Sequence, residues 1–431
     1  MKDRERTLEE KIVQRKARVC VLGLGYVGLP LALRFAEVGF KVSGIDVDED
    51  KVEKINKRIP YVEGVSFTAV PESIHATTDP SLLAQADAAL ICVPTPLSKT
   101  RDPDLSFVLE AGRTIAQHLH SGQIIVLEST TYPGTTRELL LPLLEKSGLK
   151  VGSDFFLVYS PERIDPGNKT FNLANTPKVV AGITPACLEL GRVIYSQIVN
   201  RVVPVKNADT AEMVKLLENV FRSVNIALVN EFAIMCHRLG LDVWDVIEAA
   251  STKPYGFLPF YPGPGLGGHC IPVDPHYLSW KLRALAYKAR FIELADDINR
   301  EMPRFVVEKV VEALNRQRKS VMGSRILILG AAYKRDSADV RESPSLDIMK
   351  FLHERGAEIS YHDPYVRCLS FNGQLLHSVP LDAQSLFSCD AVVVATDHSV
   401  FDSRELVEHS RLIIDARNLT CGIESKKIIR L

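Results

Sequence analysis

The chain has 431 residues, of which 46% are hydrophobic, and its formal net charge at pH 7 is −1. This length predicts two or three domains with sizeable cores, and the balanced charge gives no reason to expect nucleic-acid binding. No apolar run approaches the roughly 18 residues that span a bilayer, and the charged N-terminus, with a polar helix expected over 4–16, lacks a signal peptide's apolar segment. The cysteines show no CxxC spacing, and Cys20, Cys92 and Cys389 lie in apolar runs. This pattern predicts reduced thiols in a cytoplasmic protein.

The first α/β segment has the pattern of a dinucleotide-binding turn. An apolar strand over 18–22 leads into Gly23, Gly25 and Gly28, and a second strand ends in Asp46. The first glycine permits the tight turn, the second lets the backbone approach a pyrophosphate, and the third lets the following helix pack on the strand. The Asp46 carboxylate would accept from ribose hydroxyls and repel a 2′-phosphate, which predicts NAD rather than NADP. The alternative is a strand–helix turn with no ligand.

Strand-like and helical stretches then alternate. The strand-like runs cover 88–93, 124–127 and 155–158, and the helical stretches lie around 50–58, 104–119 and 135–146. This alternation predicts a parallel sheet with right-handed crossovers. Polar segments come directly after three of the strands, and ligands bind at the carboxyl ends of strands in such sheets. We therefore expect Thr95, Thr130 and Glu162 at a cofactor and substrate rim, although each segment is also compatible with an ordinary turn.

The region from 205 to 316 changes to a helical pattern. One long helix is expected over 210–233 and another over 287–316. Polar residues lie along one stripe of the first helix, namely Lys215, Asn219, Arg222, Asn225 and Asn230. Burying such groups without partners costs about 1–3 kcal/mol each, so the stripe is either part of a site or a solvated face.

Between these helices lies a loop over 263–277 with four glycines within six residues, together with Cys270 and Asp274. A thiol beside a carboxylate, on a loop that permits close approach, is a possible covalent-catalysis site. The alternative is a buried cysteine beside a Gly/Pro turn. His269 and His276 add a possible zinc site, but four ligands within eight residues that include two prolines are hard to close tetrahedrally, so no metal is expected.

The last region has the pattern of a second, shorter doubly wound unit. Its strands are expected at 324–330, 358–363, 391–395 and 412–415. It lacks GxGxxG, so a second dinucleotide is not expected. Lys334, Arg335 and Arg341 come after its first strand, where they could hold a nucleotide diphosphate or simply form a surface basic cluster.

The whole chain is therefore expected to be an α/β protein with two Rossmann-like doubly wound domains joined by a central helical domain. The predicted boundaries are 1–204 for the NAD-binding domain, 205–316 for the helical domain with the cysteine loop, and 317–431 for the C-terminal domain. The central helices are also a possible dimer interface.

Taken together, the motifs resemble the UDP-glucose/GDP-mannose dehydrogenase family over nearly the whole chain. The motifs that carry the resemblance are Gly23-Leu-Gly-Tyr-Val-Gly28, Glu128-Ser-Thr130, Ser160-Pro-Glu162, Lys215-Leu-Leu-Glu-Asn219, Gly267-Gly-His-Cys270 with Asp274, Gly330-Ala-Ala-Tyr-Lys334 and Asp339-Val-Arg341. The run from Gly267 through Asp274 looks like the branch acting on UDP-N-acetylhexosamines. Residues 160–168 resemble UDP-N-acetylglucosamine 6-dehydrogenases more than the UDP-N-acetylmannosamine enzymes.

The resemblance implies an NAD-dependent four-electron oxidation of the C6 alcohol of a UDP-N-acetylhexosamine, with UDP-GlcNAc preferred, to a uronate for polysaccharide or glycan precursor synthesis. Cys270 would carry a thiohemiacetal and then a thioester. UDP-N-acetylmannosamine and UDP-glucose are the alternative substrates, and a homodimer is expected. A nucleotide-sugar-binding protein without activity and a two-electron dehydrogenase stay open as other classes, but neither needs a nucleophilic thiol.

The resemblance also implies roles for residues at matching positions. Lys215 and Asn219 would stabilise developing negative charge, Glu162 would activate water, and Thr130 and Asp274 would order water or the hydroxyl. The expected cofactor contacts are Gly23, Gly25, Tyr26, Val27, Gly28, Asp46, Thr95, Thr130 and Arg341. The expected substrate contacts are Glu162, Arg163, Lys215, Asn219, Gly267 and Lys334, the last of these holding the UDP moiety.

One position departs from the family pattern. UDP-glucose enzymes carry a second glutamate four residues after the first, and this chain has Pro166 there. The roles of that glutamate therefore do not transfer. We hypothesise that Arg163 or Asp165 replaces it and suits an N-acetyl group.

Overall fold

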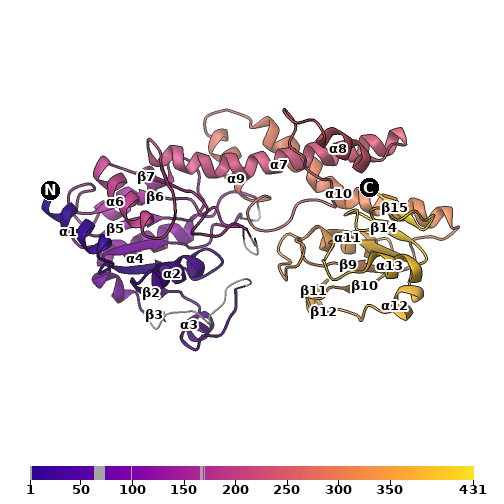
Figure 1. Ribbon diagram of the computed structural model, residues 1–431, viewed down its shortest axis with the longest axis horizontal. Coiled ribbons are helices and arrows are strands. Elements are labelled where there is room, and N and C mark those ends of the chain that lie inside the picture. The colour runs from indigo at the N-terminus through magenta and orange to yellow at the C-terminus, as the bar shows by residue number, and fades with distance from the viewer. Residues whose placement is uncertain (1, 63–72, 99, 166–167, 169) are drawn as a thin grey trace. The chain divides into compact units, whose positions relative to one another are not determined.

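The computed structural model describes residues 2–62, 73–98, 100–165, 168 and 170–431, so Pro166 lies outside the described residues. The chain divides into two compact parts, which are described separately. The N-terminal unit comprises residues up to 218 together with 276–287, and the C-terminal unit comprises 219–275 and 288–431. Figure 1 shows both, with the N-terminal unit in indigo to magenta and the C-terminal unit mostly in orange and yellow.

The N-terminal unit is built on a sheet whose strand order is β3-β2-β1-β4-β5-β6-β7-β8. The strands are β1 (Arg18–Leu22), β2 (Lys41–Ile45), β3 (Ile74–Thr77), β4 (Ala88–Ile91), β5 (Ile124–Leu127), β6 (Phe156–Tyr159), β7 (Lys178–Gly182) and β8 (Val202–Pro204). The helical segments are α1 (Lys2–Val13), α2 (Gly28–Glu37), α3 (Glu49–Asn56), the 3₁₀ segment η1 (Pro80–Gln85), α4 (Ser106–His118), the π-helical segment η2 (Thr135–Leu140), α5 (Leu141–Glu145) and α6 (Pro185–Ser196).

The expected parallel sheet is confirmed for β1 to β6, but β7 runs antiparallel to β6. A parallel return usually needs a crossover helix. The connection over 160–177 has no helix in its described residues, and the chain turns back beside β6 instead. The start of β7 therefore lies at the edge of the sheet where β6 ends.

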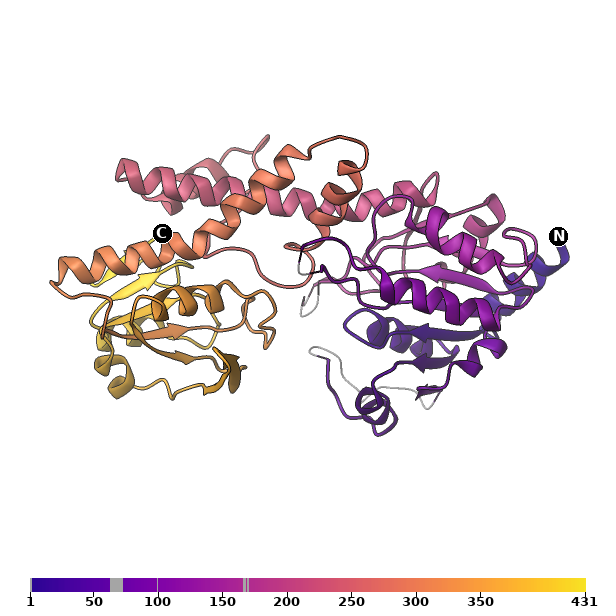
Figure 2. The same ribbon diagram turned by 180° about the vertical axis from the view of Figure 1, so that it is seen from behind.

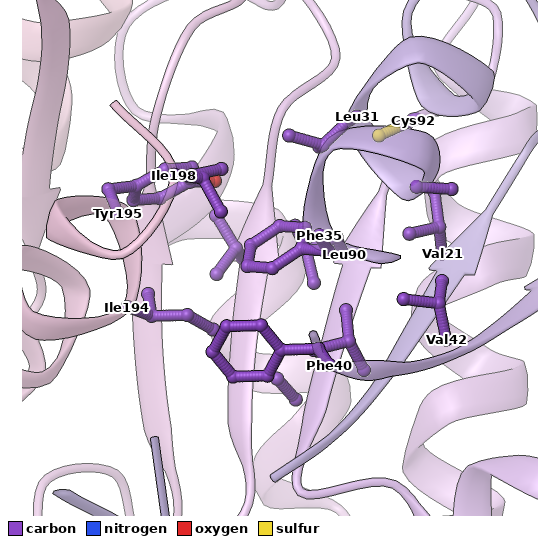
Figure 3. Packing of buried hydrophobic residues seen from close by; sticks show 14 of the residues in the cluster. Val21, Leu31, Phe35, Phe40, Val42, Leu90, Cys92, Ile194, Tyr195 and Ile198 are labelled. Carbon is purple, nitrogen blue, oxygen red and sulfur yellow. The ribbon is translucent and has the colours of Figure 1, made fainter. Parts of the chain in front are cut away.

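The core of this unit forms between the sheet and the helices on one of its faces. Figure 3 shows Phe35 from α2, the neighbouring Phe40, and Ile194 and Tyr195 from α6 packed over the strands. The Phe35 and Phe40 rings meet edge to face, with their centroids 5.5 Å apart. Burial of such apolar side chains contributes about 1.5–3 kcal/mol each, and it fixes the strand ends that carry the polar segments.

The C-terminal unit combines helices with a second parallel sheet of order β10-β9-β13-β14-β15. The strands are β9 (Arg325–Leu329), β10 (Glu358–His362), β13 (Ala391–Val394), β14 (Ile413–Asp415) and β15 (Ile428–Arg430), and β11 (Cys368–Phe371) pairs with β12 (Gln374–His377) as a hairpin. The helices are α8 (Val243–Ser251), α10 (Arg290–Arg316), α11 (Pro344–His353), α12 (Ala383–Ser388) and α13 (Ser403–His409). Figure 2 shows this sheet and its covering helices from behind.

Two further helices belong to both units by residue number. Helix α7 (Ala208–Leu239) and helix α9 (Asp274–Arg283) each cross a unit boundary. The long helix expected from 287 instead begins at Arg290. A turn in which Ala286 adopts φ +53° precedes it, and such left-handed backbone does not occur within a right-handed helix. The expected fold class, two Rossmann-like sheets with a helical region between them in sequence, is confirmed.

Candidate active site

The turn after β1 contains two glycines that close packing requires and one glycine that faces open space. Gly23 has φ +87°, and a Cβ there would lie 2.6 Å from the Cys92 carbonyl oxygen. A Cβ on Gly28 would lie 1.8 Å from the Gly23 carbonyl oxygen. Around Gly25, in contrast, no described atom beyond its chain neighbours lies within 4 Å of the Cβ position. The backbone at Gly25 is therefore open to the close approach of a pyrophosphate.

Helix α2 and Asp46 complete this turn. Among the described residues, no side chain caps the N-terminus of α2, so its first N–H groups remain for an anion. The buried Asp46 carboxylate accepts from Leu24 N at 2.8 Å and from Asp48 N at 3.0 Å. A carboxylate has about four acceptor sites, so capacity remains for ribose hydroxyls. Tyr26 and Val27 lie within the turn, and these features fit NAD.

Two polar segments meet at the same edge of the sheet. Thr95 lies after β4 and is buried, and Thr130 lies after β5 and is half-buried. The Ser129 hydroxyl joins the two segments by donating to the Val93 carbonyl at 2.7 Å. The expected rim residues of β4 and β5 therefore lie side by side at the carboxyl ends of the strands.

Glu162 lies in a buried ionic cluster. The Lys178 ammonium donates to Glu128 Oε2 at 2.6 Å and to Glu162 Oε2 at 3.0 Å, and the Tyr195 hydroxyl donates to Glu128 Oε1. All four side chains are buried. Sequence reasoning missed Lys178, and its signal was a lysine at the start of the otherwise apolar run 178–182.

The cluster sets the ionisation of its two glutamates in opposite directions. Burial raises the pKa of Glu128 to about 7, although the Lys178 ammonium lowers it in part. Burial also acts to raise the pKa of Glu162, but the Lys178 ammonium and the Ile164 backbone N–H outweigh it and hold that pKa below its ordinary value. Glu162 is therefore ionised at neutral pH, whereas Glu128 titrates close to neutral pH.

Two more predicted residues lie close to Glu162, namely Lys215 on helix α7 and its chain neighbour Arg163. Lys215 is half-buried, and its charge also lowers the pKa of Glu162. The Arg163 guanidinium donates to Glu218 Oε1 at 2.6 Å and to the Pro177 carbonyl at 2.6 Å. Arg163 is therefore anchored to α7 and to the chain before β7, and its role in substrate binding stays a prediction.

In the C-terminal unit, two buried asparagines of α7 hold the ends of the cysteine loop. Asn230 Oδ1 accepts from Gly263 N at 2.9 Å, and its Nδ2 donates to Asn299 Oδ1 at 2.9 Å. Asn219 Nδ2 donates to Asp274 Oδ2 at 2.5 Å. These partners explain why amides lie on this helix, and two members of the expected polar stripe prove to be buried.

Cys270 lies between these two attachments. The Asp274 N–H donates to the Cys270 carbonyl at 2.8 Å, so the residues after the thiol turn directly into α9. Cys270 itself is exposed, whereas Asp274 and Asn219 are buried. The loop thus carries an exposed cysteine residue between hydrogen-bonded ends.

The loop glycines pack against the segment that comes after β9. A Cβ on Gly267 would lie 2.3 Å from Tyr333 Cβ, and one on Gly268 would lie 2.6 Å from Tyr333 Cζ. Gly268 N also donates to the Arg341 carbonyl at 2.9 Å. The close approach expected at these glycines is therefore to a neighbouring tyrosine of the same unit, and a contact of Gly267 with substrate stays a prediction.

The basic residues after β9 have different surroundings. Both Arg341 Nε and Nη2 donate to the Asp339 carboxylate, at 2.9 Å and 2.6 Å. Lys334 is half-buried in the same segment. Burial, and then the charge of Arg341, lower the pKa of His269, so this residue is neutral at pH 7.

The residues predicted to act in catalysis fall into two groups. The N-terminal unit holds Thr130, Glu162 and Lys215, and the C-terminal unit holds Asn219, Cys270 and Asp274. Their catalytic roles stay predictions. Within the described residues, no group of three or more His, Cys, Asp or Glu side chains is arranged to hold a metal ion.

Three family models match successive parts of the chain. They describe the NAD-binding domain, the central domain and the UDP-binding domain of the UDP-glucose/GDP-mannose dehydrogenase family, over residues 17–199, 209–301 and 327–421. A UDP-N-acetyl-D-mannosamine dehydrogenase of Pyrococcus horikoshii is 36% identical over 93% of this chain and 96% of its own.

The chain belongs to the UDP-glucose/GDP-mannose dehydrogenase family. A UDP-N-acetyl-D-glucosamine 6-dehydrogenase of Pseudomonas aeruginosa is 34% identical over 96% of this chain and 99% of its own. The solved UDP-D-ManNAc dehydrogenase of Pyrococcus horikoshii superposes with a TM-score of 0.88 at 35% identity, and covers 96% of this chain and 98% of that one.

Family membership confirms the expected NAD cofactor, the UDP-sugar class of substrate and the dehydrogenase activity. It also confirms a three-domain arrangement with a helical central domain, whereas the predicted boundaries at 204 and 316 stay predictions. In the described part of the chain, no helix combines the length and apolar character that crossing a membrane requires.

Proposed function

We propose that this enzyme oxidises the C6 alcohol of a UDP-N-acetylhexosamine, with UDP-GlcNAc as the preferred substrate, to the corresponding uronate. The observation that carries the proposal is the exposed Cys270 thiol on a loop whose ends are hydrogen-bonded to buried asparagines of α7. A dehydrogenase that stops at an aldehyde needs no such nucleophile, whereas oxidation to an acid gains from one.

The thiol divides the oxidation of the aldehyde to the acid into steps with lower barriers. When bound, NAD⁺ would supply the hydride acceptor for C6 in each oxidation, so two would be consumed for each sugar. The Cys270 thiolate adds to the C6 aldehyde to form a thiohemiacetal, whose oxidation leaves a thioester. Water then adds to the thioester, the C–S bond breaks, and the uronate leaves with the thiol restored.

Charged and amide groups would stabilise the oxygen at C6 during these steps. In this proposal, Lys215 and Asn219 offer donors to the developing alkoxide. Glu162 accepts a proton from the hydrolytic water, and Thr130 and Asp274 order that water. The Lys178 ammonium holds the pKa of Glu162 below its ordinary value, so the carboxylate is ionised and able to accept a proton at neutral pH.

The N-acetylhexosamine class rests on sequence relatives of two kinds. Relatives of similar identity are named UDP-N-acetyl-D-mannosamine dehydrogenase and UDP-N-acetyl-D-glucosamine 6-dehydrogenase. We favour the glucosamine epimer because of the run Ser160-Pro-Glu-Arg-Ile-Asp165. In this proposal Lys334 holds the UDP moiety, and Arg163 or Asp165 adapts the site to the N-acetyl group.

A substrate panel tests the reaction and the epimer together. Purified enzyme is supplied with NAD⁺ and UDP-GlcNAc, UDP-ManNAc, UDP-GalNAc or UDP-glucose, and NADH is measured against sugar consumed. We expect the highest kcat/KM for UDP-GlcNAc and two NADH for each sugar. One NADH for each sugar would contradict the thioester route, and preference for UDP-ManNAc would correct the epimer.

We also propose that the enzyme is a homodimer formed through the central helical domain. The part of α7 in the C-terminal unit exposes large apolar side chains, namely Phe221, Leu228, Phe232, Met235 and Leu239. Their spacing places them along one stripe of the helix, and such stripes are typical of interfaces. Light scattering should show a dimer, and Leu228→Glu with Phe232→Glu should give a monomer. A monomeric unmodified enzyme would reject the proposal.

The cytoplasm is the proposed location, and polysaccharide or glycan precursor synthesis is the proposed use of the product. Burial raises the pKa of Cys20 to about 12, so this thiol stays protonated and unreactive in a reducing compartment. Growth on labelled GlcNAc and subsequent analysis of uronate-containing glycans would test the second part.

A further inference from the structure

Lys178 reaches Glu162 because β7 runs against β6. In that antiparallel pair Val158 lies opposite Gly182 and Tyr159 opposite Ala181. Continued beyond the end of β6, the same register places residue 178 opposite residue 162. The reversed strand thus delivers a lysine to the carboxyl edge of the sheet, where ligands of α/β proteins bind.

The contacts of Glu162 leave its carboxylate little freedom. Its Oε1 accepts from Arg163 N at 2.7 Å and from Ile164 N at 2.6 Å, and its Oε2 accepts from Lys178 Nζ at 3.0 Å. Rotation of the side chain would break charge-assisted bonds in a buried site. The backbone fixes one oxygen, and Lys178 fixes the other.

Several charged or titratable groups surround this carboxylate. Glu128 lies across Lys178 and is itself bonded to Tyr195, and Lys215 acts on Glu162 from α7. Cys92, directly after β4, lies close enough to interact electrostatically with both glutamates and Lys178. Without Lys178, two carboxylates would share a buried site, an arrangement in which one of them takes up a proton.

We propose that Lys178 is a positioning residue for the oxidation, which acts through Glu162 by keeping that carboxylate ionised and fixed in direction. The inference rests on the proposed function, in which Glu162 accepts a proton. Lys178 is distinct from Lys215, which belongs to the expected catalytic set. No local motif connects Lys178 with the site, because the contact depends on the direction of β7.

The test is the pH dependence of kcat for Lys178→Met. We expect the acid limb of the profile to move upward by about 1–3 pH units, because the buried Glu162 loses its cation. Lys178→Arg keeps the charge and should restore most of the wild-type profile. Lys206→Met removes an exposed lysine of the same unit and should leave the profile unchanged.

A second variant guards against misfolding. Lys178→Met leaves two buried carboxylates without a cation, which is costly to the fold. Glu128→Gln with Lys178→Met removes one charge of each sign and leaves Glu162 as the only carboxylate of the cluster. It should fold more readily and should still show the upward shift of the acid limb.

A titration without turnover separates this inference from the proposed function. Carboxyl-¹³C glutamate labelling, with the Glu162 signal assigned by its loss in Glu162→Gln, measures the pKa of Glu162 directly. The pKa of Glu162 should rise in both variants that carry Lys178→Met and should stay low in Lys178→Arg.

The outcomes are distinct. An unchanged Glu162 pKa, or a kcat lowered equally at all pH values, would reject the positioning role of Lys178. A wild-type enzyme that oxidises none of the four UDP-sugars would reject the proposed function, while the titration would still decide whether Lys178 controls Glu162.

Discussion

The two Rossmann-like sheets begin in the same way and then diverge. Gly23 follows β1 with φ +87°, and Gly330 follows β9 with φ +84°. A Cβ on either glycine would meet the chain just beyond an adjacent strand, at 2.6 Å from the Cys92 oxygen in one case and 2.4 Å from Thr396 Cβ in the other. The tight turn is therefore a requirement of this strand arrangement and by itself indicates no ligand.

The two turns differ in the segment that comes after each glycine. In the N-terminal unit α2 begins at Gly28, so its N-terminus lies beside the turn. In the C-terminal unit α11 begins only at Pro344, and the intervening segment carries Lys334 and Arg341 and packs on the cysteine loop. One unit leaves a helix terminus for an anion, and the other supplies basic side chains instead.

The aspartate that follows the second strand of each sheet also has different partners in the two units. Asp46 accepts from the two backbone N–H groups of Leu24 and Asp48. Asp363 accepts from five donors, namely the N–H groups of Ala331, Ala332, Tyr365 and Val366 and His398 Nε2. Asp363 has no acceptor capacity left, so it is a structural residue. Equivalent positions in the two sheets therefore have different roles.

The largest expected effect concerns the loop attached to the longer turn. Cys270→Ala removes the nucleophile, and we expect uronate formation to fall by about a thousandfold or more. NAD binding, measured by quenching of protein fluorescence, should be retained because the dinucleotide turn belongs to the other unit. Normal turnover in this variant would overturn the role of the thiol.

Substitutions at two glycines should distinguish a position that affects NAD binding from one that affects folding stability. Gly25→Val fills the open approach at the first turn and should weaken NAD binding by about a hundredfold, with little change in Tm. Gly330→Ala should instead cost about 2–4 kcal/mol of folding free energy, because φ is positive and Thr396 blocks the Cβ. Equal effects of both variants on NAD affinity would remove the distinction between the two turns.

The smallest expected effects concern the two acids. Asp46→Asn should weaken NAD binding by about tenfold, whereas Asp363→Asn should cost about 1–3 kcal/mol because the amide NH₂ faces backbone donors. Calorimetry and NAD titration distinguish these losses. A variant at Asp363 as stable as the wild type would contradict its structural role.

Asp363 also gives a pH dependence of stability. Burial acts to raise its pKa, but the hydrogen bonds from His398 and the backbone outweigh it and hold the pKa below the ordinary value. Its contribution is therefore complete above its unfolded pKa of about 3.9 and is lost as pH falls through the lower folded pKa. Asp363→Asn should show less of this acid-dependent loss when unfolding is measured between pH 5 and pH 2.

Local sequence patterns predicted those parts of the fold that depend on neighbouring residues. The backbone conformation of the glycine turn follows from the spacing of Gly23, Gly25 and Gly28. The strands likewise follow from their own apolar runs. The direction of β7 was not predictable, because an apolar run reads the same in a parallel or antiparallel strand. The partners of Lys178 and Asn230 lie far along the chain, so the residue types were visible but the contacts were not.

The two asparagines of α7 set a geometric limit on the cysteine loop. Asn219 and Asn230 lie about 16 Å apart along the helix axis, at 1.5 Å for each residue. The loop segment between Gly263 and Asp274 could extend to about 36–40 Å. This surplus of chain has to bow away from the helix, which accounts for an exposed thiol between two buried anchor points. Loop length, as well as side-chain chemistry, therefore determines how far the sulfur stands from α7.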